Sequence, residues 1–179
     1  MVDTVPTRRP ELVREIVGSL ARRNSTATVL FHHAVAERLG LGSTDHKCLD
    51  LLLERGAMTG SELAAITGLT SGAITGVVAR LERTGRVRRE PDPDDGRRQV
   101  LRPVPEGLRD IQDMFASVQQ EAAGLLEGFD AHQLTAIAEF LTRGTDFAYR
   151  RAALLRAQTL ISGGHVRAAA RTVAPAHQE

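Results

Sequence analysis

The sequence predicts a mainly α-helical fold that carries one small β-hairpin. Residues 10–39 and 105–162 repeat apolar residues at spacings of three and four, which is the pattern of one buried helix face. Between these stretches, two short helical patterns are joined by a glycine-containing turn, as in a helix-turn-helix. Directly after this pair, two short strand-like runs enclose a cluster of turn-forming residues. The chain of 179 residues is therefore expected to form one helix-turn-helix unit between long flanking helices.

The first helix is expected from Pro10 to about Leu39, because proline suits a first helical turn, where its missing N–H has no partner to lose. Residues 40–43, rich in glycine, end this helix. A second helix is expected over residues 45–55, with Thr44 as its cap. The apolar face of the first helix consists of Leu12, Ile16, Leu20, Val29, Leu30 and Ala34.

The helix-turn-helix pair follows. Thr59 precedes Glu62 by three positions, which is the spacing of a capping box at the start of a helix. A tight turn is expected at residues 68–70, because glycine there can adopt a positive φ. Thr70 can then cap a second short helix over residues 71–84.

A β-hairpin is expected immediately after this pair. Its strands are residues 87–90 and 97–102, and the segment between them, Pro-Asp-Pro-Asp-Asp-Gly, is a dense turn signal. A hairpin in this position would form the wing of a winged helix-turn-helix.

Two further helices are expected toward the C-terminus. One begins at Pro105 and runs to about Phe129, with a coiled-coil-like apolar seam, and the other is capped by Asp130. Residues 163–179 lack such periodicity and are expected to form a mobile tail. The expected regions are an N-terminal dimerisation helix (1–43), a winged helix-turn-helix (44–104), C-terminal dimerisation helices (105–162) and a flexible tail (163–179).

Composition narrows the class of protein. The single cysteine, Cys48, excludes an intrachain disulfide or a Cys-rich metal site and fits a reducing cytoplasm. Neither a signal peptide nor a run long enough to span a membrane is present, so a cytoplasmic protein is expected. No P-loop, dinucleotide fingerprint or nucleophile elbow is found, and the carboxylates are dispersed, so an enzyme is not expected.

Positive charge gathers in one window. The whole chain has a net charge of +1, whereas residues 70–102 contain eight arginines against five acidic residues. Arginine suits bidentate contact with phosphate and with guanine. By charge alone, an ordinary solvated surface explains this excess equally well.

The helix expected over residues 71–84 has two contrasting faces. Ile74, Val77, Val78 and Leu81 share the face that must pack on the protein. The opposite face is nearly bare, and Gly72 and Gly76 each cost a helix up to about 1 kcal/mol relative to alanine. A helix that sinks into a DNA groove would explain this cost, and relief of crowding against a neighbouring helix is the alternative. The side chains on or beside the bare face are Thr75, Ala79, Arg80 and Arg83.

Arg97 and Arg98 follow the hairpin turn and could enter a narrow minor groove, where the potential is most negative. Asp92, Asp94 and Asp95 would then act locally, by capping the turn or holding an arginine. A charged, solvated hairpin is the alternative, although it does not explain the clustered arginines.

Two other groups of side chains have the chemistry of metal or redox sites. His33 and Glu37 are four positions apart and could share a metal, but no third ligand is evident, and His46 is expected to lie elsewhere. His32 and His33 are therefore expected to line a helix junction, without a metal. Cys48 lies on an apolar helix face and is expected to be a buried structural thiol, not an oxidant sensor.

Several short runs occur in a specific order and spacing. They are Glu62-Leu63-Ala64, Thr67-Gly68-Leu69-Thr70, Gly72-Ala73-Ile74-Thr75, Arg80-Leu81-Glu82-Arg83, Gly85-Arg86-Val87-Arg88-Arg89 and Asp92-Pro93-Asp94-Asp95. With these runs, the sequence resembles the MarR family of dimeric winged helix-turn-helix transcriptional regulators. The upstream run from Val35 to Leu41, followed by Thr44-Asp45, is also similar to members of this family.

The resemblance implies that residues 71–84 form the recognition helix, that Arg97 matches the wing arginine, and that the terminal helices form a homodimer. Gly96 departs from the family, which usually has an arginine at that position. The expected DNA-binding residues are Thr70, Ser71, Gly72, Thr75, Gly76, Ala79, Arg80, Arg83, Arg97 and Arg98.

The expected function is that of a regulator, a repressor in particular, that binds an inverted repeat in double-stranded DNA and is released by a small aromatic ligand. The residues that bind such a ligand are not indicated, and no cofactor is expected. A winged-helix module that has lost DNA binding and instead binds a protein is the rival interpretation. That module would carry acidic or apolar residues on the outer helix face, where this chain has arginines.

Overall fold

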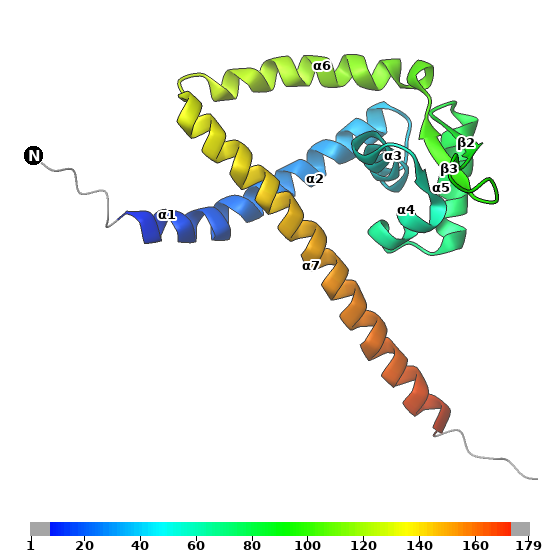
Figure 1. Ribbon diagram of the computed structural model, residues 1–179. Coiled ribbons are helices and arrows are strands. Elements are labelled where there is room, and N and C mark those ends of the chain that lie inside the picture. The colour runs from blue at the N-terminus through cyan, green and yellow to red at the C-terminus, as the bar shows by residue number, and fades with distance from the viewer. Residues whose placement is uncertain (1–7, 173–179) are drawn as a thin grey trace, which may run out of the picture.

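The computed structural model describes the backbone of residues 8–172 and the side chains of residues 8–159. Two long helical arms extend from a small unit of short helices and strands (Figure 1). The N-terminal arm consists of residues 9–38 and the C-terminal arm of residues 109–172. The elements are, in order, α1 (Arg9–Glu15), the π-helical segment η1 (Ile16–Leu20), α2 (Ala21–Arg38), α3 (Ser43–Arg55), β1 (Met58–Thr59), α4 (Gly60–Thr67), α5 (Ser71–Arg83), β2 (Val87–Pro91), β3 (Gln99–Pro103), the 3-10 turn η2 (Pro105–Leu108), α6 (Arg109–Ala123), the 3-10 turn η3 (Gly124–Leu126) and α7 (Ala131–Thr172).

The helix-turn-helix pair forms as its local signals predict. The backbone N–H of Glu62 donates to the Thr59 hydroxyl, and the Glu62 carboxylate accepts from the Thr59 N–H, which completes the capping box of α4. Gly68 adopts a φ of 76° in the turn, and the Thr70 hydroxyl caps α5 by accepting from the N–H of Ala73. The axes of α4 and α5 differ by 116°, a crossing typical of this motif.

The expected hairpin is part of a three-stranded antiparallel sheet of order β1-β3-β2. In the wing, Val87 pairs with Pro103 and Pro91 with Gln99. The third strand was not predicted. Met58 and Thr59 pair with Leu101 and Val100, and two residues are too few to show a strand period in the sequence.

Several helix ends differ from the expectation. Thr44 does not cap α3, because the helix begins at Ser43, two residues before the expected start, with Gly42 in the cap position. The helix expected from Pro105 to Phe129 is divided: a 3-10 turn precedes α6, and α6 itself ends at Ala123. Gly128 follows this end with a φ of 86°, a backbone conformation that suits glycine and that allows the chain to reverse. Asp130 caps α7 as predicted, through its carboxylate and the N–H of Gln133.

The expected tail begins too early. The structure continues α7 to Thr172, so residues 163–172 are helical, while residues 173–179 lie outside the described residues. The alanines at positions 168–170 have the highest helix propensity and extend the helix beyond the two glycines at 163 and 164.

The hydrophobic core lies within residues 35–111. The inner face of α5 is buried against α3 and α4, as its spacing predicts, and the sheet and the start of α6 close the core. The buried hydrophobic side chains are Val35, Ala36, Cys48, Leu49, Leu51, Leu52, Met58, Leu63, Ile74, Val77, Val78, Leu81, Val87, Val100, Leu101, Leu108 and Ile111.

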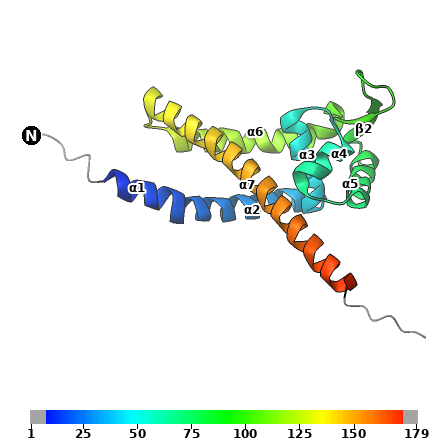
Figure 2. The same ribbon diagram turned by 60° about the horizontal axis from the view of Figure 1, so that its bottom comes forward.

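The two arms bury far less of their apolar surface. Among the described side chains, every large hydrophobic residue that is exposed lies on the arms, except Leu53. The C-terminal arm turns back after α6, and α7 crosses α2 in both views (Figures 1 and 2). Within the described residues, no single helix has the length and apolarity to cross a membrane, and only α4 and α5 taken together meet both criteria.

Candidate nucleic-acid interface

The outer face of α5 is exposed, as its composition predicts. Thr70, Ser71, Gly72, Thr75 and Ala79 all face solvent. A Cβ atom added to Gly72 would meet no other atom within 4 Å, and one added to Gly76 would meet only Nη1 of Arg80, at 3.3 Å. Crowding against a neighbouring helix therefore does not explain either glycine.

Arg80 anchors α5 to α3. Its Nε and Nη2 each donate to one carboxylate oxygen of Asp45, both at 2.7 Å, in a bidentate ion pair. The Asp45 side chain is buried, whereas 47% of the Arg80 side chain is exposed. Asp45 also raises the pKa of Arg80, through these hydrogen bonds and through its charge. Two of the three guanidinium nitrogens thus hold the helix in place, and the third, Nη1, lies beside Gly76.

The aspartates of the wing act locally, as expected from the sequence. The Asp92 carboxylate accepts from the N–H of Asp94, and the Asp95 carboxylate accepts from the N–H of Arg97. Backbone hydrogen bonds join Asp92 to Arg98 and Arg98 to Asp95 across the turn. The acidic residues therefore build the turn that presents the arginines.

The eight arginines of the basic window differ in their partners. Arg86 is buried and binds Asp110 at 2.8 Å and 3.0 Å, and Arg89 binds Glu82. Arg88 and Arg102 both bind Glu90, and Arg98 lies 3.8 Å from Asp92. Among the described side chains, Arg83 and Arg97 are exposed and have no ion-pair partner.

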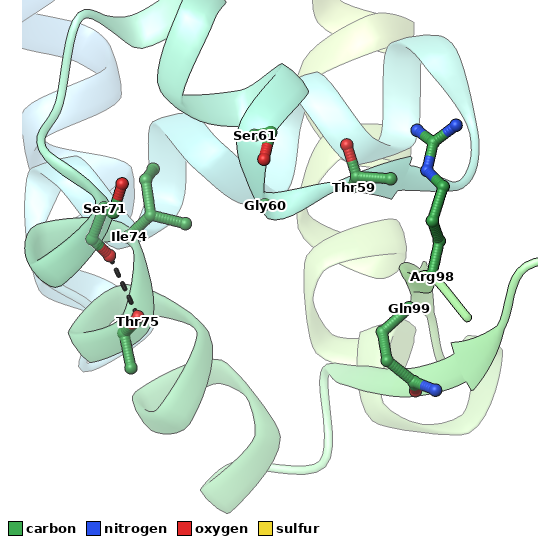
Figure 3. Close-up of a pocket in the computed structure, with 8 residues that line it drawn as sticks. All are labelled: Thr59, Gly60, Ser61, Ser71, Ile74, Thr75, Arg98 and Gln99. Carbon is green, nitrogen blue, oxygen red and sulfur yellow. Dashed lines mark hydrogen bonds between the residues drawn. The ribbon is translucent and has the colours of Figure 1, made fainter.

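A cavity of about 380 Å³ joins α5 to the wing. Ser71 and Thr75 line it from the start of α5, Thr59 and Gly60 from the start of α4, and Arg98 from the wing. Figure 3 shows the Arg98 side chain extending toward Thr59, and the hydrogen bond of 2.9 Å from the Thr75 hydroxyl to the Ser71 carbonyl. The start of α5 and the wing therefore border one continuous surface of mixed polar and apolar character.

A larger cavity of about 900 Å³ lies between α2, α3, α4 and α7. Its wall includes His32, His46 and Cys48 as well as Tyr149 and Arg156 of α7. Arg156 donates to the carbonyl of Ile66, and Tyr149 donates to Glu54 at 2.7 Å, so α7 closes one side of the cavity.

The histidines near this cavity differ in their neighbours. His33 is exposed and lies 3.4 Å from Glu37, with no further ligand beside it among the described residues. His32 lies at the α2–α3 junction, as expected. The expectation that His46 lies elsewhere is wrong, because Nδ1 of His32 and Nε2 of His46 are 3.2 Å apart. The tight turn at residues 40–42 brings α3 back along α2 and places these rings together.

The environment of these groups sets their ionisation. Burial lowers the pKa of His32, with Lys47 acting in the same direction and Asp50 opposing. Burial is also the main reason that the pKa of His46 is lowered. Cys48 is fully buried, as expected, and burial together with Asp45 raises the pKa of its thiol to about 11. A thiol with this pKa is not a reactive oxidant sensor.

Known proteins resemble this chain in sequence. Residues 41–98 match the model of the MarR family. The uncharacterized HTH-type transcriptional regulator YcgE of Bacillus subtilis is 41% identical over 138 residues, which cover 77% of this chain and 89% of the relative.

Solved structures share the fold. Wild-type MarR of E. coli, in its apo form, has a TM-score of 0.52 and is 20% identical, with 70% of this chain and 93% of that chain covered. Bordetella bronchiseptica BpsR, whose DNA binding is regulated by 6-hydroxynicotinic acid, has a TM-score of 0.50 and is 22% identical. That match covers 74% of this chain and 95% of BpsR.

Proposed function

The chain belongs to the MarR family of DNA-binding transcriptional regulators, which are not enzymes, and we propose that it is a repressor that binds an inverted repeat as a homodimer. The cavity that Ser71 and Thr75 share with Arg98 carries this proposal. Because α5 and the wing line this cavity together, we infer that they form a single DNA-binding surface. On it, α5 enters the major groove while the wing follows the adjacent backbone or minor groove.

The outer face of α5 suits close approach to base pairs. Gly72 and Gly76 leave space for the groove floor, Thr75 and Ala79 can contact thymine methyl groups, and Arg83 can reach a guanine or a phosphate. Because few side chains can donate hydrogen bonds here, direct readout should be limited to a few base pairs in each half-site. A two-fold dimer would place the half-site centres about 34–36 Å apart.

We also propose that a small aromatic ligand releases the DNA by binding in the cavity between α2, α3, α4 and α7. Its wall combines apolar side chains with a few polar groups, which is typical of ligand sites. The regulation of BpsR by 6-hydroxynicotinic acid supports this class of effector. Such a ligand acts only if it binds the DNA-free state more tightly than the DNA-bound state.

The experiment uses Gly76→Leu. Binding sites are first selected from a random pool of DNA duplexes, and the affinity of the variant for the best site is then compared with that of the native chain. We expect thermal stability to hold or rise, because leucine has the higher helix propensity, while affinity falls at least tenfold, or about 1.4 kcal/mol.

A matched control is Gln112→Leu, which places leucine at an exposed position on α6 without changing the charge. It should leave DNA affinity unchanged. If Gly76→Leu also leaves affinity unchanged, the outer face of α5 does not enter a groove and the proposed interface is wrong.

A further inference from the structure

Three side chains able to ligate a metal converge where α2 packs on α3. Nδ1 of His32 and Nε2 of His46 are 3.2 Å apart, and each lies 3.6 Å from Oδ2 of Asp50. His46 and Asp50 are one helical turn apart on α3, and His32 faces them from α2. These are the only three such residues that come together in the part of the chain that the structure describes.

The dimensions of this triangle match those of a metal site. With bonds of about 2.0–2.2 Å from zinc to nitrogen and oxygen in a tetrahedral arrangement, the ligand atoms are about 3.3–3.5 Å apart. The observed separations of 3.2–3.6 Å bracket this value. We propose that His32, His46 and Asp50 form a divalent transition-metal site that takes Zn²⁺, with a fourth position open to the neighbouring cavity.

Hydrogen bonding alone does not account for this arrangement. The two imidazoles can share one hydrogen bond, but 3.6 Å is too long for a hydrogen bond from either ring to Asp50. The carboxylate is therefore close to both rings without bonding to them. A metal ion would bond to all three atoms with little movement, and the fit of His46 in particular is rigid because only 1% of this residue is exposed.

The ligand types favour a transition metal. Two imidazoles and one carboxylate are a common ligand set for zinc, whereas magnesium and calcium take oxygen ligands only. Three protein ligands leave one tetrahedral position for water or for a donor atom of a bound molecule. His32 and His46 both line the cavity of about 900 Å³, so that position is accessible from it.

Lys47 competes with the metal. Its Nζ donates to Oδ2 of Asp50 at 3.0 Å, the same oxygen that faces the two rings. The ammonium group thus supplies the positive charge near Asp50 when no metal is bound. Because 54% of the Lys47 side chain is exposed, it can swing into solvent when a metal binds. Removing the Lys47 charge should therefore strengthen metal binding.

The experiment measures zinc affinity on the untagged full chain after removal of metals with a chelator. Zinc is titrated against a chromophoric zinc chelator, in the absence of DNA, so that the result does not depend on the proposed regulatory function. We expect one tight site per chain. His32→Gln and Asp50→Asn should each weaken it at least tenfold, and Lys47→Gln should strengthen it about two- to fivefold, the range for loss of an exposed charge pair.

The matched control is His33→Gln, which removes the adjacent exposed histidine and should leave the tight site unchanged. A second readout is the visible spectrum of the Co²⁺-loaded protein, because four-coordinate cobalt absorbs visible light strongly. His32→Gln should abolish this absorption. Thermal unfolding of the zinc-free variants confirms that they are folded. The proposal is overturned if the native chain has no micromolar zinc site, or if His32→Gln binds zinc as tightly as the native chain does.

Discussion

At the scale of single residues, the arginines of the basic window have different tasks. Arg80 and Arg86 are held by Asp45 and Asp110, whereas Arg97 is exposed at the wing and has no ion-pair partner among the described side chains. A free guanidinium can neutralise a phosphate without first losing an internal partner. Arg97 is therefore the best candidate for binding a phosphate at the wing.

Arg97→Ala should lower affinity for all DNA sequences alike and flatten the dependence of log affinity on log salt. The expected change in slope is about 0.9 for each phosphate that the variant no longer neutralises. The measurement is DNA affinity across a range of salt concentrations. Arg88→Ala, whose guanidinium is paired with Glu90, is the control and should change the slope less. A slope equal to that of the native chain would show that Arg97 does not bind a phosphate.

Gly107 is a second residue whose role only the structure reveals. A Cβ atom at this position would lie 2.0 Å from the carbonyl oxygen of Gly85, so the backbone must shift to accept any side chain. Gly107→Ala should destabilise the protein by about 1–3 kcal/mol or more, as overpacking does. Urea unfolding measures the change. Gly124→Ala, where the added Cβ meets no atom within 4 Å, should have little effect, and equal stability of both variants would refute the close approach.

At the scale of elements, two ion pairs fix the parts of the interface relative to the core. Asp45 of α3 holds α5 through Arg80, and Asp110 of α6 holds the chain just before β2 through Arg86. Arg86 also donates to the carbonyls of Leu39 and Gly107, so one side chain joins three segments. The wing is thus tied to the C-terminal arm at its base.

This connection should be sensitive to acid. Hydrogen bonds from Arg86 lower the pKa of Asp110 below its ordinary value of 3.8, so the unfolded chain binds the proton more readily than the folded chain does. The stabilisation is therefore fully present above the ordinary pKa and is lost as the pH falls through the lower folded value. Asp110→Asn should be less stable than the native chain at pH 7.

The difference in stability between the native chain and Asp110→Asn should shrink as the pH falls below about 4, because the native chain then loses the same interaction. Urea unfolding midpoints at several pH values between 7 and 3 measure this. Asp113→Asn removes a carboxylate from the same helix without touching Arg86 and serves as the control. A difference that stays constant down to pH 3 would show that the Asp110 charge does not contribute.

At the scale of the whole molecule, the two arms leave much apolar surface uncovered. The exposed leucines, valines and phenylalanines lie on α1, η1, α2, η3, the loop after η3 and α7, where the single chain has no second layer to bury them. Contiguous exposed apolar surface of this kind usually marks an interface between proteins. A second copy related by a two-fold axis would cover the arms of both chains.

Leu141→Asp tests this assembly. Leu141 is 57% exposed on α7, and a charge there would have to be buried in the proposed dimer interface. We expect the native chain to sediment as a dimer at micromolar concentration and the variant to dissociate. Arg143→Asp, two positions further along and already 79% exposed, should remain dimeric. A monomeric native chain would contradict the proposed homodimer.

The sequence determined the local structure. The capping box of Thr59 and Glu62, the cap at Thr70 and the glycine turn at Gly68 all depend on residues within three or four positions of one another. Such signals are read directly along the chain, and so is the apolar face of α5. They were sufficient to predict the helix-turn-helix and the wing.

Only the tertiary structure decided which side chains are partners. Arg80 and Asp45 are 35 positions apart, His32 and His46 are 14 apart, and β1 is a strand only because β3 lies beside it. No periodicity carries this information, because it depends on how the helices pack and where the chain reverses. The sequence therefore placed the arginines and histidines on their elements, while packing decided which arginines are free to bind DNA and which histidines can share a metal.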